Sequence, residues 1–322
     1  MRMLVAILAL ASSAVLAQPS AEETLSAVVG VSSRIPAGAR SAATLGTERR
    51  GSGALIREQY VLTIGYLVME AEAVEVTSSE GRTVPATVAA FDQVSGFGLL
   101  KLAAPLRGTP LALGDSAGLS ENEPAMVISA PGREGASIVR VVSRRGFSGG
   151  WEYMLDSAIF THPAVPEWSG APLIGPRGEL LGIGSLIVAD ADGQGGGQTP
   201  GNLFVPIDLL KPILSDLIAS GRRRGPARPW LGVNTDEVRG HLFVARVSPG
   251  GPAERAGLRA DDIVLAVAGD EVHTLAELYS KIWSRGAAGV DVPLRVLRGA
   301  QVRNVTVRSI DRAQYFKGST AY

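Results

Sequence analysis

The segment "PEWSGAPLIGPRGELLGIG", residues 166–184, places a serine in a tight turn of small residues and follows that turn with a hydrophobic strand. Ser169 stands between Trp168 and Gly170, an arrangement in which proteins often present a nucleophilic serine. A serine hydroxyl alone is a weak nucleophile, because it needs a base within hydrogen-bond reach and donors for the oxyanion. The remainder of the chain must therefore supply a base if this serine is to react.

Short strands lie on both sides of this segment. Residues 25–205 contain β-rich runs such as "LSAVVGVSS", "AVEVTSS", "FGLLKL" and "SIVRVVS", which are separated by Gly, Pro, Ser and Asp. Regular short strands with turn residues between them predict an antiparallel sandwich or barrel. One helix is predicted after the strands, over residues 206–221, because apolar residues recur there at helical spacing and Gly221 is a suitable end.

A second, smaller unit follows the strands. The run "GRRRGPAR" at 221–228 is rich in Arg and Gly, and we interpret it as a solvated linker. Residues 229–310 then combine strands such as "HLFVARVS" with the predicted helix "TLAELYSKIWSRG". The glycine-rich stretch at 192–202 lacks phosphate-loop spacing, so it is predicted to be a surface loop.

Composition excludes several classes of protein. The chain has 322 residues, enough for two domains. Lys and Arg together number 31, as do Asp and Glu, and this balance argues against a general nucleic-acid-binding protein. The absence of cysteine excludes a disulfide framework, a thiolate nucleophile and a cysteine-ligated metal, but it leaves the compartment open. We expect no metal and no cofactor.

The N-terminal sequence predicts a cleavable signal peptide over residues 1–17. Arg2 precedes an apolar stretch, and Val15 and Ala17 satisfy the small-residue rule for cleavage after Ala17. An uncleaved anchor is the alternative, although the apolar stretch is short compared with the roughly 20 residues that a membrane helix needs. No cysteine follows, which excludes a lipoprotein anchor. We therefore expect a periplasmic or secreted protein without a membrane span after signal cleavage.

Three further segments occur in an order typical of one protein family. The segments "GSGALI…YVLT", "NLFVPIDLLKPILSDLIASGR" and "VSPGGPAERAGLRADDIVLAVAGDEV", together with 166–184, resemble the HtrA/Deg family of exported serine proteases over nearly all of the mature chain. The resemblance implies a mostly β fold with a chymotrypsin/trypsin-like double β-barrel followed by one α+β PDZ domain. It also implies domain limits: a barrel domain at 18–221, a basic linker at 222–228, a PDZ domain at 229–311 and a C-terminal tail at 312–322.

The resemblance implies positions for a catalytic triad, and two of the three are replaced. The serine position is kept as Ser169, but the histidine position holds Tyr66 and the aspartate position holds Gly96. Tyrosine has a reference pKa near 10 and is a poor base at neutral pH, and glycine cannot orient a base. Asp92 lies four residues before Gly96, but with no histidine to orient it is expected to have no role.

The turn before the serine also departs from the family pattern. Glu167 and Trp168 stand where the family has Gly-Asn, so the oxyanion turn of Glu167, Trp168 and Ser169 carries a negative charge beside a site that should stabilise one. His162 lies on the strand that enters this turn, and Lys101 matches a position that faces solvent in the family. We expect neither of them to activate Ser169.

The smaller unit contains a predicted peptide-binding site. Its carboxylate loop is the segment "PWLGV", with Trp230, Leu231, Gly232 and Val233 in the loop positions. Successive backbone N–H groups in such a loop can hold an anion, and a peptide should add as a strand beside it. Four apolar residues of the following helix have helical spacing: Leu275, Leu278, Tyr279 and Ile282. We expect Leu278 and Ile282 to face the groove; the alternative is that all four are core residues and the groove is closed.

These observations predict an exported HtrA-like pseudoprotease that binds polypeptides with free hydrophobic C-termini, in envelope protein quality control. One alternative is an active serine endopeptidase with unorthodox site chemistry. A second alternative is a structural or regulatory subunit of an active family protease. An oligomer is possible, but no Phe, Tyr or Trp occurs between residues 18 and 59, where family trimers often use aromatic residues.

Overall fold

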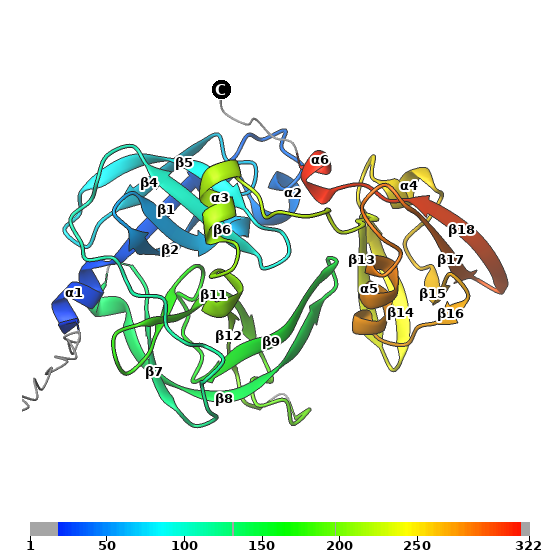
Figure 1. The fold of residues 1–322 in the computed structure, drawn as a ribbon. Coiled ribbons are helices and arrows are strands. Elements are labelled where there is room, and N and C mark those ends of the chain that lie inside the picture. The colour runs from blue at the N-terminus through cyan, green and yellow to red at the C-terminus, as the bar shows by residue number, and fades with distance from the viewer. Residues whose placement is uncertain (1–18, 131, 197, 317–322) are drawn as a thin grey trace, which may run out of the picture.

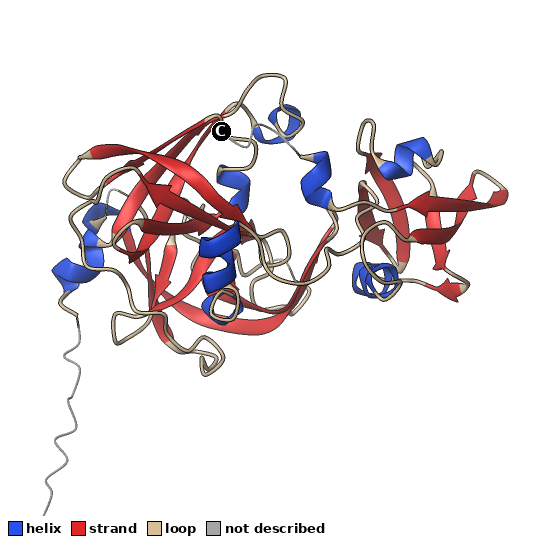
Figure 2. Ribbon diagram, turned by 45° about the horizontal axis from the view of Figure 1, so that its top comes forward, coloured by secondary structure: helices blue, strands red, loops and turns tan. Residues whose placement is uncertain are grey.

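The computed structural model describes residues 19–130, 132–196 and 198–316 (Figure 1). The predicted signal peptide lies outside the described residues, as does most of the predicted tail. Strands dominate and the helices are short (Figure 2). Two barrels lie next to each other, and a smaller unit stands beside them.

The first barrel closes in the strand order β1-β2-β3-β6-β5-β4. Its strands are β1 (Val28–Arg34), β2 (Glu48–Arg57), β3 (Tyr60–Ile64), β4 (Ala73–Thr77), β5 (Thr83–Phe91) and β6 (Phe97–Leu102). Short helices accompany them: α1 (Ala21–Ser26), α2 (Ala42–Leu45) and the 3-10 helix η1 (Gly65–Leu67). The side chains of β6 are buried except for Lys101, as expected for a strand that runs through a closed barrel.

The second barrel closes in the order β10-β11-β12-β9-β8-β7. Its elements are β7 (Pro124–Ile128), η2 (Arg133–Gly135), β8 (Ala136–Gly149), β9 (Tyr153–His162), β10 (Pro172–Ile174), β11 (Leu180–Val188) and β12 (Gly201–Pro206). Strands β8 and β9 stay paired as far as Gly149 and Tyr153. Their long hairpin therefore projects from the barrel toward the third unit (Figure 1).

The third unit is a sheet in the order β13-β14-β15-β17-β18, with β16 paired to β15. Its elements are β13 (Val233–Val238), β14 (His241–Val247), α4 (Pro252–Arg255), β15 (Ile263–Val267), β16 (Asp270–Glu271), α5 (Leu275–Trp283), β17 (Asp291–Arg298), β18 (Gln301–Arg308) and α6 (Arg312–Tyr315). A capping box of Thr274 and Glu277 begins α5. The predicted fold class, a double β-barrel followed by one α+β unit, is confirmed.

The helix predicted over residues 206–221 is broken in two. The 3-10 helix η3 (Ile207–Leu209) is separated from α3 (Leu214–Ser220). Pro212 lies between them, and a proline inside a helix removes one backbone donor and clashes with the preceding turn. The predicted end is correct, because Gly221 caps α3 in the left-handed conformation. Among the described residues, no helix is long and apolar enough to cross a membrane.

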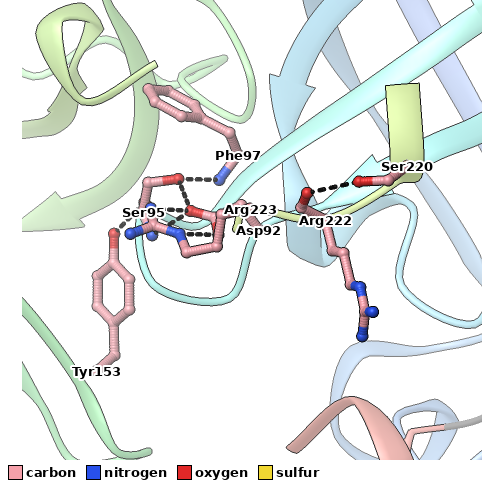
Figure 3. A network of polar contacts seen from close by, with 7 residues as sticks. All are labelled: Asp92, Ser95, Phe97, Tyr153, Ser220, Arg222 and Arg223. Atoms are coloured by element: carbon pink, nitrogen blue, oxygen red, sulfur yellow. Dashed lines mark hydrogen bonds and ion pairs between the residues drawn. The ribbon is translucent and has the colours of Figure 1, made fainter. Parts of the chain in front are cut away.

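Asp92, for which no catalytic role is predicted, has a structural role. Its buried carboxylate accepts hydrogen bonds from Nε and Nη2 of Arg223, each at 2.7 Å (Figure 3). It also accepts from the backbone N–H of Ser95 at 2.9 Å and from the Ser95 hydroxyl at 2.5 Å. A buried carboxylate needs such partners to replace its lost hydration, so Asp92 fixes the start of the linker to the first barrel.

The basic linker is consequently more than a solvated segment. Besides the Arg223 pair, Arg224 forms an ion pair with Asp216 of α3 at 2.8 Å. At the far end, the guanidinium of Arg228 lies 4.2 Å from the ring centroid of Trp283 in α5. The run is therefore attached to the first barrel and to the third unit.

We expect Asp92→Ala to lower the free energy of unfolding by about 2–4 kcal/mol, because it leaves the Arg223 charge and the Ser95 N–H without their acceptor. Urea unfolding checks this value. Arg222→Ala, at an exposed position of the same linker, is the matched control and should change it by no more than about 0.5 kcal/mol. Equal midpoints for the two variants would show that the buried pair does not stabilise the fold.

Candidate functional site

The fold brings Ser169 and Tyr66 into direct contact. Tyr66 lies in η1, directly after β3, and Ser169 lies in the turn before β10. The hydroxyl oxygen of Tyr66 is 2.8 Å from Ser169 Oγ and 3.0 Å from the carbonyl oxygen of Ser185. A carbonyl oxygen can only accept, so the single phenol proton goes to Ser185 and the Ser169 hydroxyl donates to Tyr66. The phenol oxygen thus occupies the place of a general base.

Tyr66 remains a neutral phenol at neutral pH. Burial raises the pKa of Tyr66 above its ordinary value of 10.0, and the nearby Ser169 hydroxyl and Trp168 indole lower it only in part. A general base needs a pKa near the working pH, and a neutral phenol oxygen is far too weak. The contact therefore has the geometry of a nucleophile and its base, but the neutral phenol is too weak a base to take the serine proton.

The buried side chain of Arg49 holds the backbone of Tyr66. Its guanidinium donates to the carbonyl oxygens of Tyr66 at 2.7 Å and Met69 at 3.0 Å. It also donates to the hydroxyl of Ser41 at 2.8 Å. Sequence reasoning missed Arg49, because nothing in the local pattern separates it from Arg50, which is exposed. A buried arginine is identified only by the carbonyl groups that the fold gathers around it.

Gly96 lies in the turn between β5 and β6, in a conformation that opposes an aspartate there. Its φ is +85°, a region that side-chain-bearing residues rarely adopt. A Cβ atom at this position would lie 3.1 Å from the hydroxyl of Tyr153, which donates to the carbonyl of Ser95 at 2.6 Å. The carbonyl of Gly96 also accepts from the backbone N–H of Gly65 at the start of η1, at 2.7 Å. The turn is thus built around glycine.

The turn before Ser169 has an ordinary backbone. In the described chain, the non-glycine residues with positive φ do not include Glu167 or Trp168. Glu167 is exposed, and the carbonyl of Ser169 accepts from the N–H of Ser52 at 2.8 Å. The indole N–H of Trp168 is buried near Tyr66 but outside hydrogen-bond geometry. Damage to the oxyanion site by Glu167 and Trp168 stays a prediction.

The other candidate bases lie elsewhere. Nδ1 of His162 is 2.8 Å from the carbonyl oxygen of Pro200, so its ring is engaged on the β12 side. Lys101 is exposed on β6.

Ser169 and Tyr66 both line a cavity of about 530 Å³ between the two barrels and the third unit. Aromatic side chains make up much of its wall: Trp151, Tyr153, Trp168, Trp230, Tyr315 and Phe316. Arg40, Arg246 and Arg312 add positive charge. A largely apolar cavity with a few polar groups is the usual form of a ligand site. The retained serine therefore lies at such a cavity.

The predicted carboxylate loop adopts a turn in which its N–H groups converge. Gly232 has a φ of +83° and Trp230 is buried. The N–H groups of Leu231, Gly232 and Val233 all donate to a carboxylate of the β8–β9 hairpin, that of Glu152. In α5 the four predicted residues are all buried: Leu275, Leu278, Tyr279 and Ile282. Leu278 and Ile282 belong to a buried cluster against which Met154 of the β8–β9 hairpin also packs, so they offer no free surface in this structure. That they face the peptide groove stays a prediction.

Two family models match the chain: a trypsin-like peptidase domain over residues 51–183 and a PDZ domain over residues 229–308. The putative serine protease HhoA of Synechocystis is 31% identical over 288 residues, which cover 81% of this chain and 70% of that protein. The chain belongs to the HtrA/Deg family.

Further family members resemble this HtrA/Deg chain. A probable periplasmic serine endoprotease DegP-like of Halomonas elongata is 31% identical over 84% of the chain. The periplasmic pH-dependent serine endoprotease DegQ of Escherichia coli is 29% identical over 81% of it. The chain spans 59% of the length of each of these two proteins. The solved HtrA-type protease AlgW with decapeptide aligns with 91% of this chain and 99% of its own at 21% identity and a TM-score of 0.53, a likeness of fold.

We expect that replacing Tyr66→His and Gly96→Asp together will not restore nucleophilic Ser169. The positive φ of Gly96 and the nearby Tyr153 hydroxyl oppose a correctly placed aspartate. Glu167 is expected to spoil the oxyanion turn independently, and loss of one oxyanion donor costs on the order of 100-fold or more. Labelling by a fluorophosphonate should stay at the level of the Ser169→Ala control. Rapid labelling that depends on Ser169 would contradict this expectation.

Proposed function

We propose that this HtrA/Deg chain is an exported pseudoprotease that binds polypeptides through its PDZ domain and serves in envelope protein quality control. The single observation that carries the proposal is the contact of Ser169 with a half-buried, neutral Tyr66. The aspartate position beside it is a glycine of positive φ. Without a base, at most the residual catalysis of binding and oxyanion donors is left.

The names of several relatives support export, since they include the word periplasmic. The predicted signal peptide points the same way. Peptide binding is supported by solved relatives described as AlgW with decapeptide and AlgW with tripeptide. The carboxylate loop supports it directly, because its three N–H groups hold a carboxylate in this structure.

The alternative of an active endopeptidase rests on the retained Ser169 hydroxyl. We expect no hydrolysis of casein or an unfolded protein above background by the purified chain, because a neutral phenol cannot take the serine proton. Release of acid-soluble fragments over time is the measurement, and the Ser169→Ala variant is the control. Turnover that Ser169→Ala abolishes would refute the pseudoprotease and establish the alternative.

We expect the PDZ domain to bind peptides that end in a free carboxylate with Val, Leu or Phe as the last residue. The N–H groups of the loop bind an anion, and the β13 edge can add a strand. Titration of labelled peptides against the same peptides with amidated ends measures the effect, and amidation should weaken binding at least tenfold. If amidation changes nothing, or no peptide binds at millimolar concentration, the peptide-binding function is wrong.

The alternative of a subunit that assembles with an active family protease predicts a different partner. Peptide binding and lack of hydrolysis would leave it open, and co-purification with such a protease would favour it.

A further inference from the structure

The carboxylate of Glu152 is the acceptor for the whole carboxylate loop. One oxygen accepts from the N–H of Leu231 at 2.9 Å, and the other accepts from Gly232 at 2.7 Å and Val233 at 3.0 Å. Glu152 is 6% exposed. Three backbone donors on one buried carboxylate satisfy most of its hydrogen-bonding capacity. The site that should receive the end of a peptide is therefore filled by a side chain of the same molecule.

The backbone of the hairpin tip follows the side chain into the same groove. The carbonyl of Gly150 accepts from the N–H of Thr235 in β13 at 2.8 Å. On the opposite wall, the Tyr279 hydroxyl of α5 donates to the carbonyl of Gly149 at 2.7 Å and accepts from the N–H of Glu152 at 3.2 Å. The tip thus lies between β13 and α5, where a bound peptide would add as a strand.

Two features of the tip indicate that it fits this position closely. A Cβ atom on Gly150 would lie 2.6 Å from the carbonyl oxygen of Thr235, so only glycine permits this approach. Glu152 ends the three-residue turn between β8 and β9 with a φ of +57°, a position where three-residue hairpins usually have glycine. The unfavourable conformation persists because the side chain is held by three donors.

The charges around the site suit a carboxylate. Burial raises the pKa of Glu152, while the N–H groups of Leu231, Val233 and Gly232 and the positive charge of Arg312 oppose that rise. Arg312 is itself half-buried in α6, where desolvation lowers its pKa and the charge of Glu152 opposes the effect. Both oxygens of Glu152 act as acceptors, which is the pattern of an ionised group.

We infer that Glu152 is a resident internal ligand of the carboxylate loop, and that a peptide with a free C-terminal carboxylate binds only by displacing the β8–β9 hairpin tip. This inference rests on the proposed peptide-binding function. The apparent affinity for a peptide is then the intrinsic affinity multiplied by the fraction of molecules whose loop is free. If nine-tenths of the molecules are self-occupied, removal of Glu152 strengthens apparent binding about tenfold.

The test compares wild type, Glu152→Ala and Asp156→Asn in the full mature chain. Asp156→Asn removes an exposed carboxylate of the same hairpin and is the matched control. Fluorescence anisotropy measures binding of a labelled peptide that ends in Val and of its amidated form. We expect Glu152→Ala to bind the peptide with a free carboxylate about tenfold or more tightly than wild type, and Asp156→Asn to bind it as wild type does. With the amidated peptide, Glu152→Ala should show no increase in affinity. Glu152→Gln, which keeps the size of the side chain, replaces the alanine variant if that fails to fold.

Hydrogen exchange of the amides of Leu231, Gly232 and Val233 is the second readout, and it needs no peptide. Loss of their protection in Glu152→Ala, but not in Asp156→Asn, supports occupancy. Equal protection in the two variants overturns it. Equal carboxylate-dependent binding by wild type and Glu152→Ala overturns displacement while the peptide-binding function stands. If no variant binds the peptide, both the peptide-binding function and the displacement of the hairpin tip by a peptide are overturned.

Discussion

Two buried carboxylates attach the PDZ unit of this protein to its barrels. A carboxylate removed from water must recover its hydrogen bonds from the protein, since an unpaired buried charge costs several kcal/mol. Asp92 recovers them from Arg223 of the linker and from Ser95. Glu152 recovers them from three backbone N–H groups of the PDZ unit. The position of the third unit thus follows from where these two groups find donors.

Hydrogen bonding of buried polar groups also connects the β8–β9 hairpin to the serine site. Tyr153, next to Glu152, donates to the carbonyl of Ser95, which immediately precedes Gly96. Its ring stacks on Trp151 with centroids 6.0 Å apart and planes 11° apart, and both side chains line the cavity that Ser169 faces. The turn that would carry a catalytic aspartate therefore instead packs against the hairpin that fills the PDZ groove.

The serine site pairs the hydroxyl of Ser169 with the phenol of Tyr66. The phenol of Tyr66 reaches the serine hydroxyl at hydrogen-bond distance and donates its own hydrogen bond to the carbonyl oxygen of Ser185. Both hydroxyl groups of the pair have a hydrogen-bond partner. Arg49, buried beneath η1, stabilises this arrangement through the backbone of Tyr66.

Much of this protein could be read from its sequence, because the signals are local. Strand periodicity and turn residues predicted an antiparallel sandwich or barrel, and the resemblance to the family predicted the double barrel and the PDZ unit. The same resemblance predicts that Tyr66 and Gly96 replace two triad members. The predicted helix at 206–221 failed at Pro212, a local signal that the apolar spacing concealed. The tertiary structure alone decided the roles of Asp92, Arg49 and Glu152. Asp92 and Arg223 are 131 residues apart, and Glu152 lies 79 residues before Leu231. Pairings over such distances have no periodicity, and only the closed barrels and the projecting hairpin bring these carboxylates to their donors.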